Sequence, residues 1–337
     1  MKKSLTLFLP ILLVTVLVFQ SAGAWERGTH AFIADQLKKA NGPYNIEEMY
    51  GAMAPDAFNY MFTQPYILYR DYLYDQTHHY FLKIQQAVKY GYEKSSSYGF
   101  ISHNDTWGAD STAHQASLTL LPDEGYVITK ARMLDEYLKG VSTDYANLFK
   151  DYPAVALEVC HNIIEAAGDI VLARYDHSVG LKITQISARP KTNMQNLMAR
   201  AYSKGLADFS LTTAAPLTLE QADQLIRATE NEFRTACLAY GWLLQQDESI
   251  ILENVIEQFK QLATVFLSAA GITPPGDELL TTLLQSSFQA AIGFIENDYL
   301  PEIMATVDML KKGMVKEIKP NVMATRPVPA QRKVKKY

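Results

Sequence analysis

The stretch YPAVALEVCHNIIEAAGDIVLARY, residues 152–175, decides the fold class. Its apolar side chains recur at three- and four-residue spacing and Pro153 stands near its start, a pattern that predicts one long helix. Val159, Ile163 and Ile164 indicate that this helix is largely buried. A buried His161 and Glu165 then need a strong compensating partner, because unpaired polar groups are costly away from water.

Helical periodicity continues on both sides of this stretch, while alternating, strand-like runs are scarce. Thr218 and Gln221 form a capping-box signature, and Thr29 is a candidate cap for an earlier helix. The sequence therefore predicts an all-α fold. The other expected helices span residues 29–42, 218–246, 249–271 (ending at Gly271) and 278–297.

Residues 1–24 have the pattern of a signal peptide. Lys2 and Lys3 precede an apolar run, and the small residues of 22–24 suit a cleavage site. The pattern predicts export, to a secreted or periplasmic location, and a mature chain that starts at Trp25. No later stretch is apolar enough to cross a bilayer.

Composition limits the function classes. With 31 basic and 36 acidic residues, the formal net charge of −5 argues against nonspecific binding of polyanions by the whole surface. Cys160 and Cys237 are too few for a disulfide framework, so one bridge and two separate buried thiols remain the alternatives.

The seven histidines all lie between residues 30 and 177, which assigns the chemistry to the first half of the chain. We therefore expect a catalytic helical region at 25–185 and a C-terminal helical region at 186–320. Residues 321–337 are rich in Pro and basic residues. They predict a solvated basic tail, with a weak tether to anionic lipid as the alternative.

Three groups of residues have the chemistry and spacing of metal ligands. His161 and Glu165 lie four apart on the long helix, as do Asp110 and His114 in GFISHNDTWGADSTAH, residues 99–114. His103 lies seven before Asp110, but Gly108 and the Asn104-Asp105 pair predict a break between them. Asp169 and Glu158, on the same helix as His161, are candidates to orient imidazoles, with a capping or solvated role as the alternative.

The third group lies earlier in the chain. APDAFNY and DQTHHYF offer Asp56 and either His78 or His79, since adjacent side chains diverge. Trp25 and His30 stand just after the expected cleavage site.

In order and ligand types, these residues resemble the zinc-dependent phospholipase C family, whose relatives include the fungal single-strand-specific nucleases. The resemblance covers about residues 25–180. It implies an all-helical fold, up to three Zn²⁺ ions in a cleft, and hydrolysis of a phosphodiester by metal-activated water.

The resemblance also implies ligand roles. Trp25, through its free amine and carbonyl oxygen, and His30 would hold one zinc ion, which Asp110 would bridge to a second. The gap from His103 to Asp110 is longer than the family's usual spacing, so Asp105 is an alternative bridging residue.

The second ion would also take His103, Asp56 and one of His78 or His79. Asp56 has a second possible role, as the base that acts on the nucleophilic water. The third ion would be held by His114, His161 and Glu165.

The resemblance predicts an exported hydrolase that acts on phospholipid head groups at a membrane surface. The alternatives are a zinc-dependent single-strand nuclease or nucleotidase, and a non-catalytic zinc-binding helical protein. The sequence leaves the oligomeric state open.

Overall fold

The computed structural model describes residues 25–38, 45–61, 65–269 and 271–318. These residues form 15 α-helices and two 3-10 helices, with no strand among them, so the all-α prediction is confirmed. No helix in these ranges is long and apolar enough to span a membrane. The expected signal peptide at 1–24 and the basic tail at 321–337 lie outside the described residues.

The helices follow one another with short connections. Their bounds are α2 (Arg27–Leu37), α3 (Asn45–Met53), η2 (Ala54–Tyr60), α4 (Ile67–His78), α5 (Lys83–Ala87), η3 (Gly91–Glu93), α6 (Lys94–His103), α7 (Ala109–His114), α8 (Tyr126–Val141), α9 (Thr143–Leu148), α10 (Pro153–Tyr175), α11 (Ser178–Ser187), α12 (Asn193–Ser210), α13 (Leu219–Leu243), α14 (Glu248–Ala269), α15 (Asp277–Ile295) and α16 (Tyr299–Ile318).

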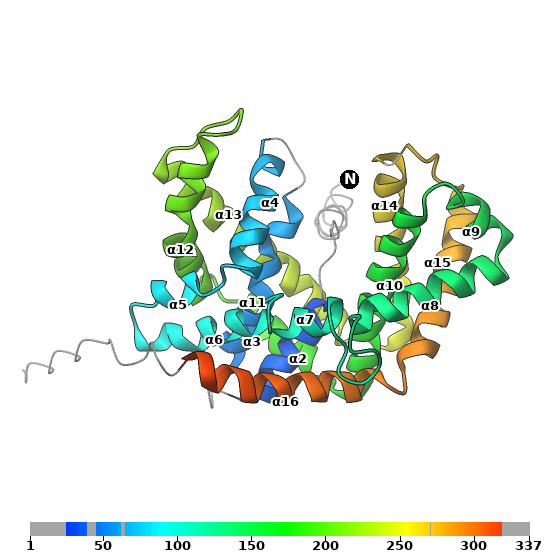
Figure 1. Ribbon diagram of the computed structural model, residues 1–337, viewed down its shortest axis with the longest axis horizontal. Helices are drawn as coiled ribbons and strands as arrows, with labels where there is room; N and C mark the ends of the chain where they lie inside the picture. The colour runs from blue at the N-terminus through cyan, green and yellow to red at the C-terminus, as the bar shows by residue number, and fades with distance from the viewer. Residues whose placement is uncertain (1–24, 39–44, 62–64, 270, 319–337) are drawn as a thin grey trace, which may run out of the picture.

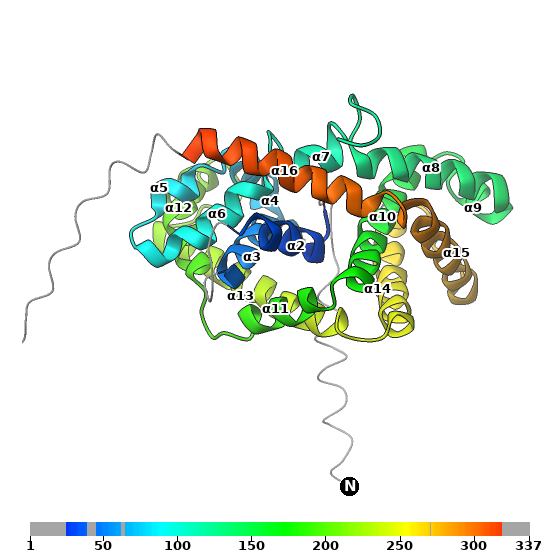
Figure 2. The same ribbon diagram turned by 90° about the horizontal axis from the view of Figure 1, so that it is seen from below.

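The helices of the two expected regions pack together around one hydrophobic core. Figure 1 shows α4, α12 and α13 rising on one side and α10, α14 and α15 on the other, with α2 between them near the base. Helix α16 runs along this base and contacts α2, α7 and α10 (Figure 2). The last described helix is therefore in contact with the first.

Helix α10 begins at Pro153, as predicted, and is buried along most of its length. Proline has no backbone N–H, which costs nothing at the first helical position because an N–H there would have no partner within the helix. Because successive turns place residues four apart on one face, His161, Glu165 and Asp169 follow one another along the helix. Helix α10 therefore carries a row of three buried polar side chains on one face.

Helix ends show which local signals were correct. The capping box of Thr218 and Gln221 is present at the start of α13, and Gly271, with φ of 75°, follows the end of α14 as expected. The Thr29 cap is wrong: α2 begins at Arg27, with Glu26 as its N-cap. Thr29 lies inside the helix, because its hydroxyl bonds to Asp169 instead.

The two cysteines do not pair. Cys160 and Cys237 are both buried and free, so of the two alternatives the structure has the separate thiols. Burial raises the pKa of each thiol to about 12. Both therefore act as small apolar side chains of the core.

Candidate metal centre

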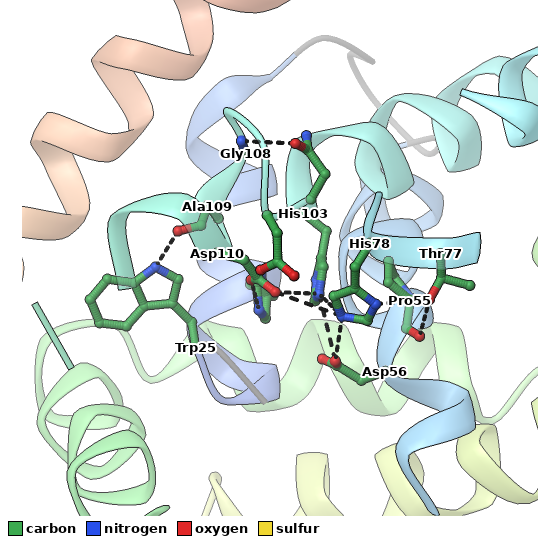
Figure 3. Close-up of polar contacts among 12 residues, drawn as sticks. Trp25, Pro55, Asp56, Thr77, His78, His103, Gly108, Ala109 and Asp110 are labelled. Atoms are coloured by element: carbon green, nitrogen blue, oxygen red, sulfur yellow. Dashed lines mark hydrogen bonds and ion pairs between the residues drawn. The ribbon is translucent and has the colours of Figure 1, made fainter. Parts of the chain in front are cut away.

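Five side chains from five elements meet at the centre of the molecule, and we call them the inner cluster. All are buried, the least so Asp56 at 5% exposure. Figure 3 shows Asp56, His78, His103 and Asp110 pointing toward one another. The inner cluster consists of His30 on α2, Asp56 on η2, His78 at the end of α4, His103 at the end of α6 and Asp110 on α7.

The predicted break between α6 and α7 makes this convergence possible. Helix α6 ends at His103, and the Asn104 side-chain oxygen accepts bonds from the N–H groups of Thr106, Trp107 and Gly108. A Cβ at Gly108 would lie 2.3 Å from the His103 carbonyl oxygen, so this tight turn requires glycine. The turn reverses the chain and brings Asp110 back against His103.

Asp110 lies between two sets of imidazoles. Its Oδ1 lies 3.2 Å from Nε2 of His30, and its Oδ2 lies 3.0 Å from Nε2 of His103 and 3.7 Å from Nε2 of His78. Asp56 closes the other side, with Oδ1 3.4 Å from His78 Nε2 and 3.5 Å from His103 Nε2. The two carboxylates thus face the same imidazole nitrogens from two directions.

The tautomers of two histidines follow from their backbone partners. Nδ1 of His103 lies 2.8 Å from the Ala52 carbonyl oxygen, and Nδ1 of His78 lies 3.1 Å from that of Tyr74. A carbonyl only accepts, so each Nδ1 carries the proton. The two Nε2 atoms then face each other at 3.1 Å. Two lone pairs this close need a cation or a further proton between them.

The electrostatics of the inner cluster favour positive charge. Burial lowers the pKa of His103, but the carboxylates of Asp110 and Asp56 outweigh it and bring that pKa to about 9. Burial acts to raise the pKa of Asp110, yet His103 and His30 hold it well below its usual value. Asp110 is therefore ionised although its side chain is buried.

Several polar atoms of the inner cluster lack hydrogen bonds within the described part of the chain. Both oxygens of Asp110 and both nitrogens of His30 are buried there without a hydrogen bond of good geometry, although Asp110 lies within ion-pair distance of His30 and His103. Native structures rarely leave such groups unpaired, because desolvation without compensation is expensive. Donors of this kind fit a bound metal ion, which would accept the free electron pairs of His30 and Asp110.

A second group, which we call the outer cluster, consists of His114, His161 and Glu165. Nε2 of His161 lies 2.7 Å from Glu165 Oε1 and 3.3 Å from His114 Nε2. The His114 side chain is 18% exposed, whereas those of His161 and Glu165 are buried. Burial, followed by the nearby Glu26 and Glu158, raises the pKa of Glu165 well above its usual value.

Two residues that the sequence offered as ligands lie outside both clusters. The side chain of His79 is 49% exposed and pairs with Asp75 at 3.3 Å, since the end of α4 turns its two adjacent histidines in different directions. Asp105 accepts a bond from the Tyr74 hydroxyl and lies 3.8 Å from His114 Nδ1. The structure thus brings His78 and Asp110, and not His79 or Asp105, into the inner cluster.

Trp25 lies beside the inner cluster. Its indole Nε1 donates to the carbonyl oxygen of Ala109 at 2.9 Å, one residue before Asp110. In Figure 3 the ring points away from the histidines, toward α7. The role of the α-amine of Trp25 as a ligand remains a prediction, because residues 1–24 lie outside the described residues.

Two carboxylates hold segments next to the clusters; sequence reasoning missed Glu302 and named Asp169 without its partners. Glu302 on α16 accepts bonds from the N–H groups of Leu118 and Thr119, just after His114. Asp169 accepts bonds from the N–H groups of Gly28 and Thr29, just before His30. The partners lie more than 100 residues apart, so no local pattern indicates them. For Asp169, the sequence suggested a cap but not which helix it caps.

Comparisons with known proteins give no further assignment: no family model, no curated protein and no solved structure matches the chain.

Proposed function

We propose that the protein is an exported, zinc-dependent phosphodiesterase that acts on phospholipid head groups in the manner of a phospholipase C. The observation that carries the proposal is the convergence of imidazole Nε2 atoms on two buried carboxylates, with Asp110 between them. Imidazole and carboxylate donors are a set that Zn²⁺ prefers. The resemblance described from the sequence supplies the reaction class.

The distances support a division of the donors among up to three ions. An imidazole Nε2 binds one ion, whereas a carboxylate has two oxygens and can bridge. Oδ1 of Asp110 would serve the ion of His30, and Oδ2 that of His103 and His78, to which Asp56 also belongs. The outer cluster would hold the third ion with its imidazoles and Glu165.

Zinc ions bound in this way supply a nucleophile from water and neutralise charge on a phosphoryl group. The chain's own residues prepare the site for this chemistry. The carbonyls of Ala52 and Tyr74 hold the rings of His103 and His78 in one tautomer and orientation. Asn59 donates to Oδ1 of Asp56 at 2.9 Å, which fixes the carboxylate that is also the candidate base.

Two cavities are lined by sequence neighbours of cluster residues, and the larger of the two is the candidate place for a substrate. One of about 470 Å³ lies between α13 and the segment from η2 to α4, and its lining includes Ala57, the neighbour of Asp56. Another, of about 20 Å³, is lined by Asn162 and Ala166, the neighbours of His161 and Glu165. The larger cavity is mostly apolar, with Met61 and Phe233 in its wall, which suits a substrate with an apolar part.

Metal analysis and a matched pair of variants test the proposal. The mature protein should contain two to three zinc ions per chain and hydrolyse a chromogenic phosphocholine ester. His78→Gln should lose metal and most activity, whereas His79→Gln, one residue away and exposed, should keep both. A chain without zinc would refute the proposal.

The same preparation separates the alternatives. Cleavage of single-stranded DNA instead of the phosphocholine ester would identify a nuclease. Bound zinc with no activity on either substrate would identify a zinc-binding protein. Mass spectrometry of the mature N-terminus should give a chain that starts at Trp25, and any other start would remove its amine from the metal site.

A further inference from the structure

Asp169 connects the helix of the outer cluster to the start of the chain. It lies on α10, one turn after Glu165, and is 1% exposed. Its Oδ2 accepts a bond from the Gly28 N–H at 2.6 Å, and its Oδ1 accepts bonds from the Thr29 N–H at 2.8 Å and the Thr29 hydroxyl at 2.6 Å. The Tyr240 hydroxyl on α13 donates to Oδ2 at 2.7 Å.

These bonds fall on the first turn of α2, where backbone N–H groups have no partner within the helix. Glu26 takes the N–H of Arg27, and Asp169 takes the next two. A carboxylate at this end also meets the positive end of the helix dipole. The N–H groups of Gly28 and Thr29 therefore connect the first turn of α2 to Asp169 on α10. The next residue along α2 is His30.

The fit is tight on both sides of the carboxylate. A Cβ at Gly28 would lie 2.5 Å from Asp169 Oδ2, so only glycine admits this contact. The Thr29 hydroxyl lies 2.6 Å from the Tyr299 hydroxyl of α16. Residues 28 and 29 are thus held by side chains from two other helices, Asp169 of α10 and Tyr299 of α16, and these contacts set the position of the following imidazole.

We infer that Asp169 is a positioning residue for the metal centre: through Gly28 and Thr29 it fixes His30 in the inner cluster relative to the outer cluster on α10. The inference rests on the proposed zinc centre and extends it. Asp169 touches no ligand atom. It acts by fixing the first turn of α2 against α10, so that the inner and outer clusters keep their positions relative to each other.

Titration of the metal-free protein with Zn²⁺, in competition with a chromophoric chelator, tests this role. In a Glu165→Gln background, which removes an outer ligand, the remaining binding reports on the inner cluster. Asp169→Asn should weaken that binding about 10- to 100-fold, the range for residues that orient metal ligands. In the Asp169→Asn single variant, which keeps Glu165, the outer cluster should keep its affinity for Zn²⁺.

Glu230→Gln is the matched control. Glu230 is also fully buried and accepts bonds from Tyr50 at 2.9 Å and Thr192 at 2.5 Å, but it contacts neither cluster. It should lower the melting temperature and leave Zn²⁺ affinity unchanged. A merely structural Asp169 would behave in the same way, so equal Zn²⁺ affinities for the two variants would overturn the inference.

Thr29→Val gives the same measurement if Asp169→Asn does not fold, because it removes the hydroxyl that donates to Asp169 and contacts Tyr299 while both backbone N–H bonds to Asp169 remain. It should weaken inner-cluster binding several-fold, and an unchanged affinity would count against the inference. Wild-type protein that binds no Zn²⁺ would overturn both this inference and the proposed function. Normal wild-type binding with unchanged variants would overturn this inference alone.

Discussion

The inner and outer clusters use the same residue types but are built in different ways. The inner cluster takes its five side chains from five elements, and backbone carbonyls fix two of its imidazoles. The outer cluster takes two of its three side chains from α10, four residues apart, and its third, His114, is partly exposed. One cluster depends on the whole fold, and the other mostly on one helix.

This difference suggests a division of labour within the proposed centre. Ions in the inner cluster would be shielded from water by side chains on every side, so they would exchange only when the protein opens locally. An ion in the outer cluster would lie next to the partly exposed imidazole of His114 and would exchange more readily.

Asp110→Asn should break the inner cluster. Removal of one partner from a buried charged group costs about 3–5 kcal/mol, and Asp110 contacts His30, His78 and His103. We expect loss of both inner ions together with a destabilisation of that size, measured by metal analysis and denaturant unfolding of the zinc-loaded protein. Asp105→Asn, outside the inner cluster, should cost only about 0.5–1.5 kcal/mol. Equal effects would show that Asp110 is not the bridge.

A chelator should remove zinc from the two clusters at different rates. With excess chelator, we expect one fast phase from the outer cluster and a phase about 100-fold slower from the inner one, the factor given by an opening free energy of about 2.7 kcal/mol. Stopped-flow measurement with a zinc indicator resolves the phases. A single phase for all ions would mean that burial does not distinguish the clusters.

Glu165→Gln should empty the outer cluster and leave the inner one filled. Since burial keeps the pKa of Glu165 well above its usual value, the folded, metal-free protein holds this carboxyl protonated at acid pH. Glutamine resembles that form, so the stability of the metal-free protein at pH 5 should change by no more than about 1 kcal/mol. Activity on the phosphocholine ester should fall at every pH. Full activity would remove the outer ion from the mechanism.

The smallest effect is expected at Cys160, one residue before His161. Burial raises the pKa of this thiol to about 12, and α10 is buried along most of its length. Iodoacetamide at pH 8 should therefore label neither Cys160 nor Cys237 in folded protein, with or without chelator. Mass spectrometry measures the labelling. Rapid labelling of Cys160 after chelation would show that α10 needs the outer ion to keep Cys160 buried.

Local patterns predicted much of the fold. The apolar spacing of 152–175 indicated α10, and the break at Asn104 and Gly108 separated His103 from Asp110 as observed. Where two candidates were adjacent, as with His78 and His79, the pattern indicated that one of them belongs to the site but not which, because side-chain direction at a helix end depends on packing. The Thr29 cap failed because a distant residue, Asp169, takes its hydroxyl.

The rest depends on contacts between distant segments. No short stretch near His114 indicates that Glu302 holds the chain after it, or that Thr306 of α16 meets Thr112 of α7 at 2.9 Å. The C-terminal region, which the sequence separated from the expected catalytic region, supplies these contacts. Its side chains lie against the segments that carry the clusters.

The contact between Thr29 and Tyr299 joins residues 270 positions apart. During synthesis, the chain emerges from its N-terminus, so His30 is available long before the helix that steadies its neighbour has been made. Until α16 has been made, Thr29 lacks its contact with Tyr299, although its bonds to Asp169 can already form. We therefore expect the last support of the proposed centre to come from the end of the described chain.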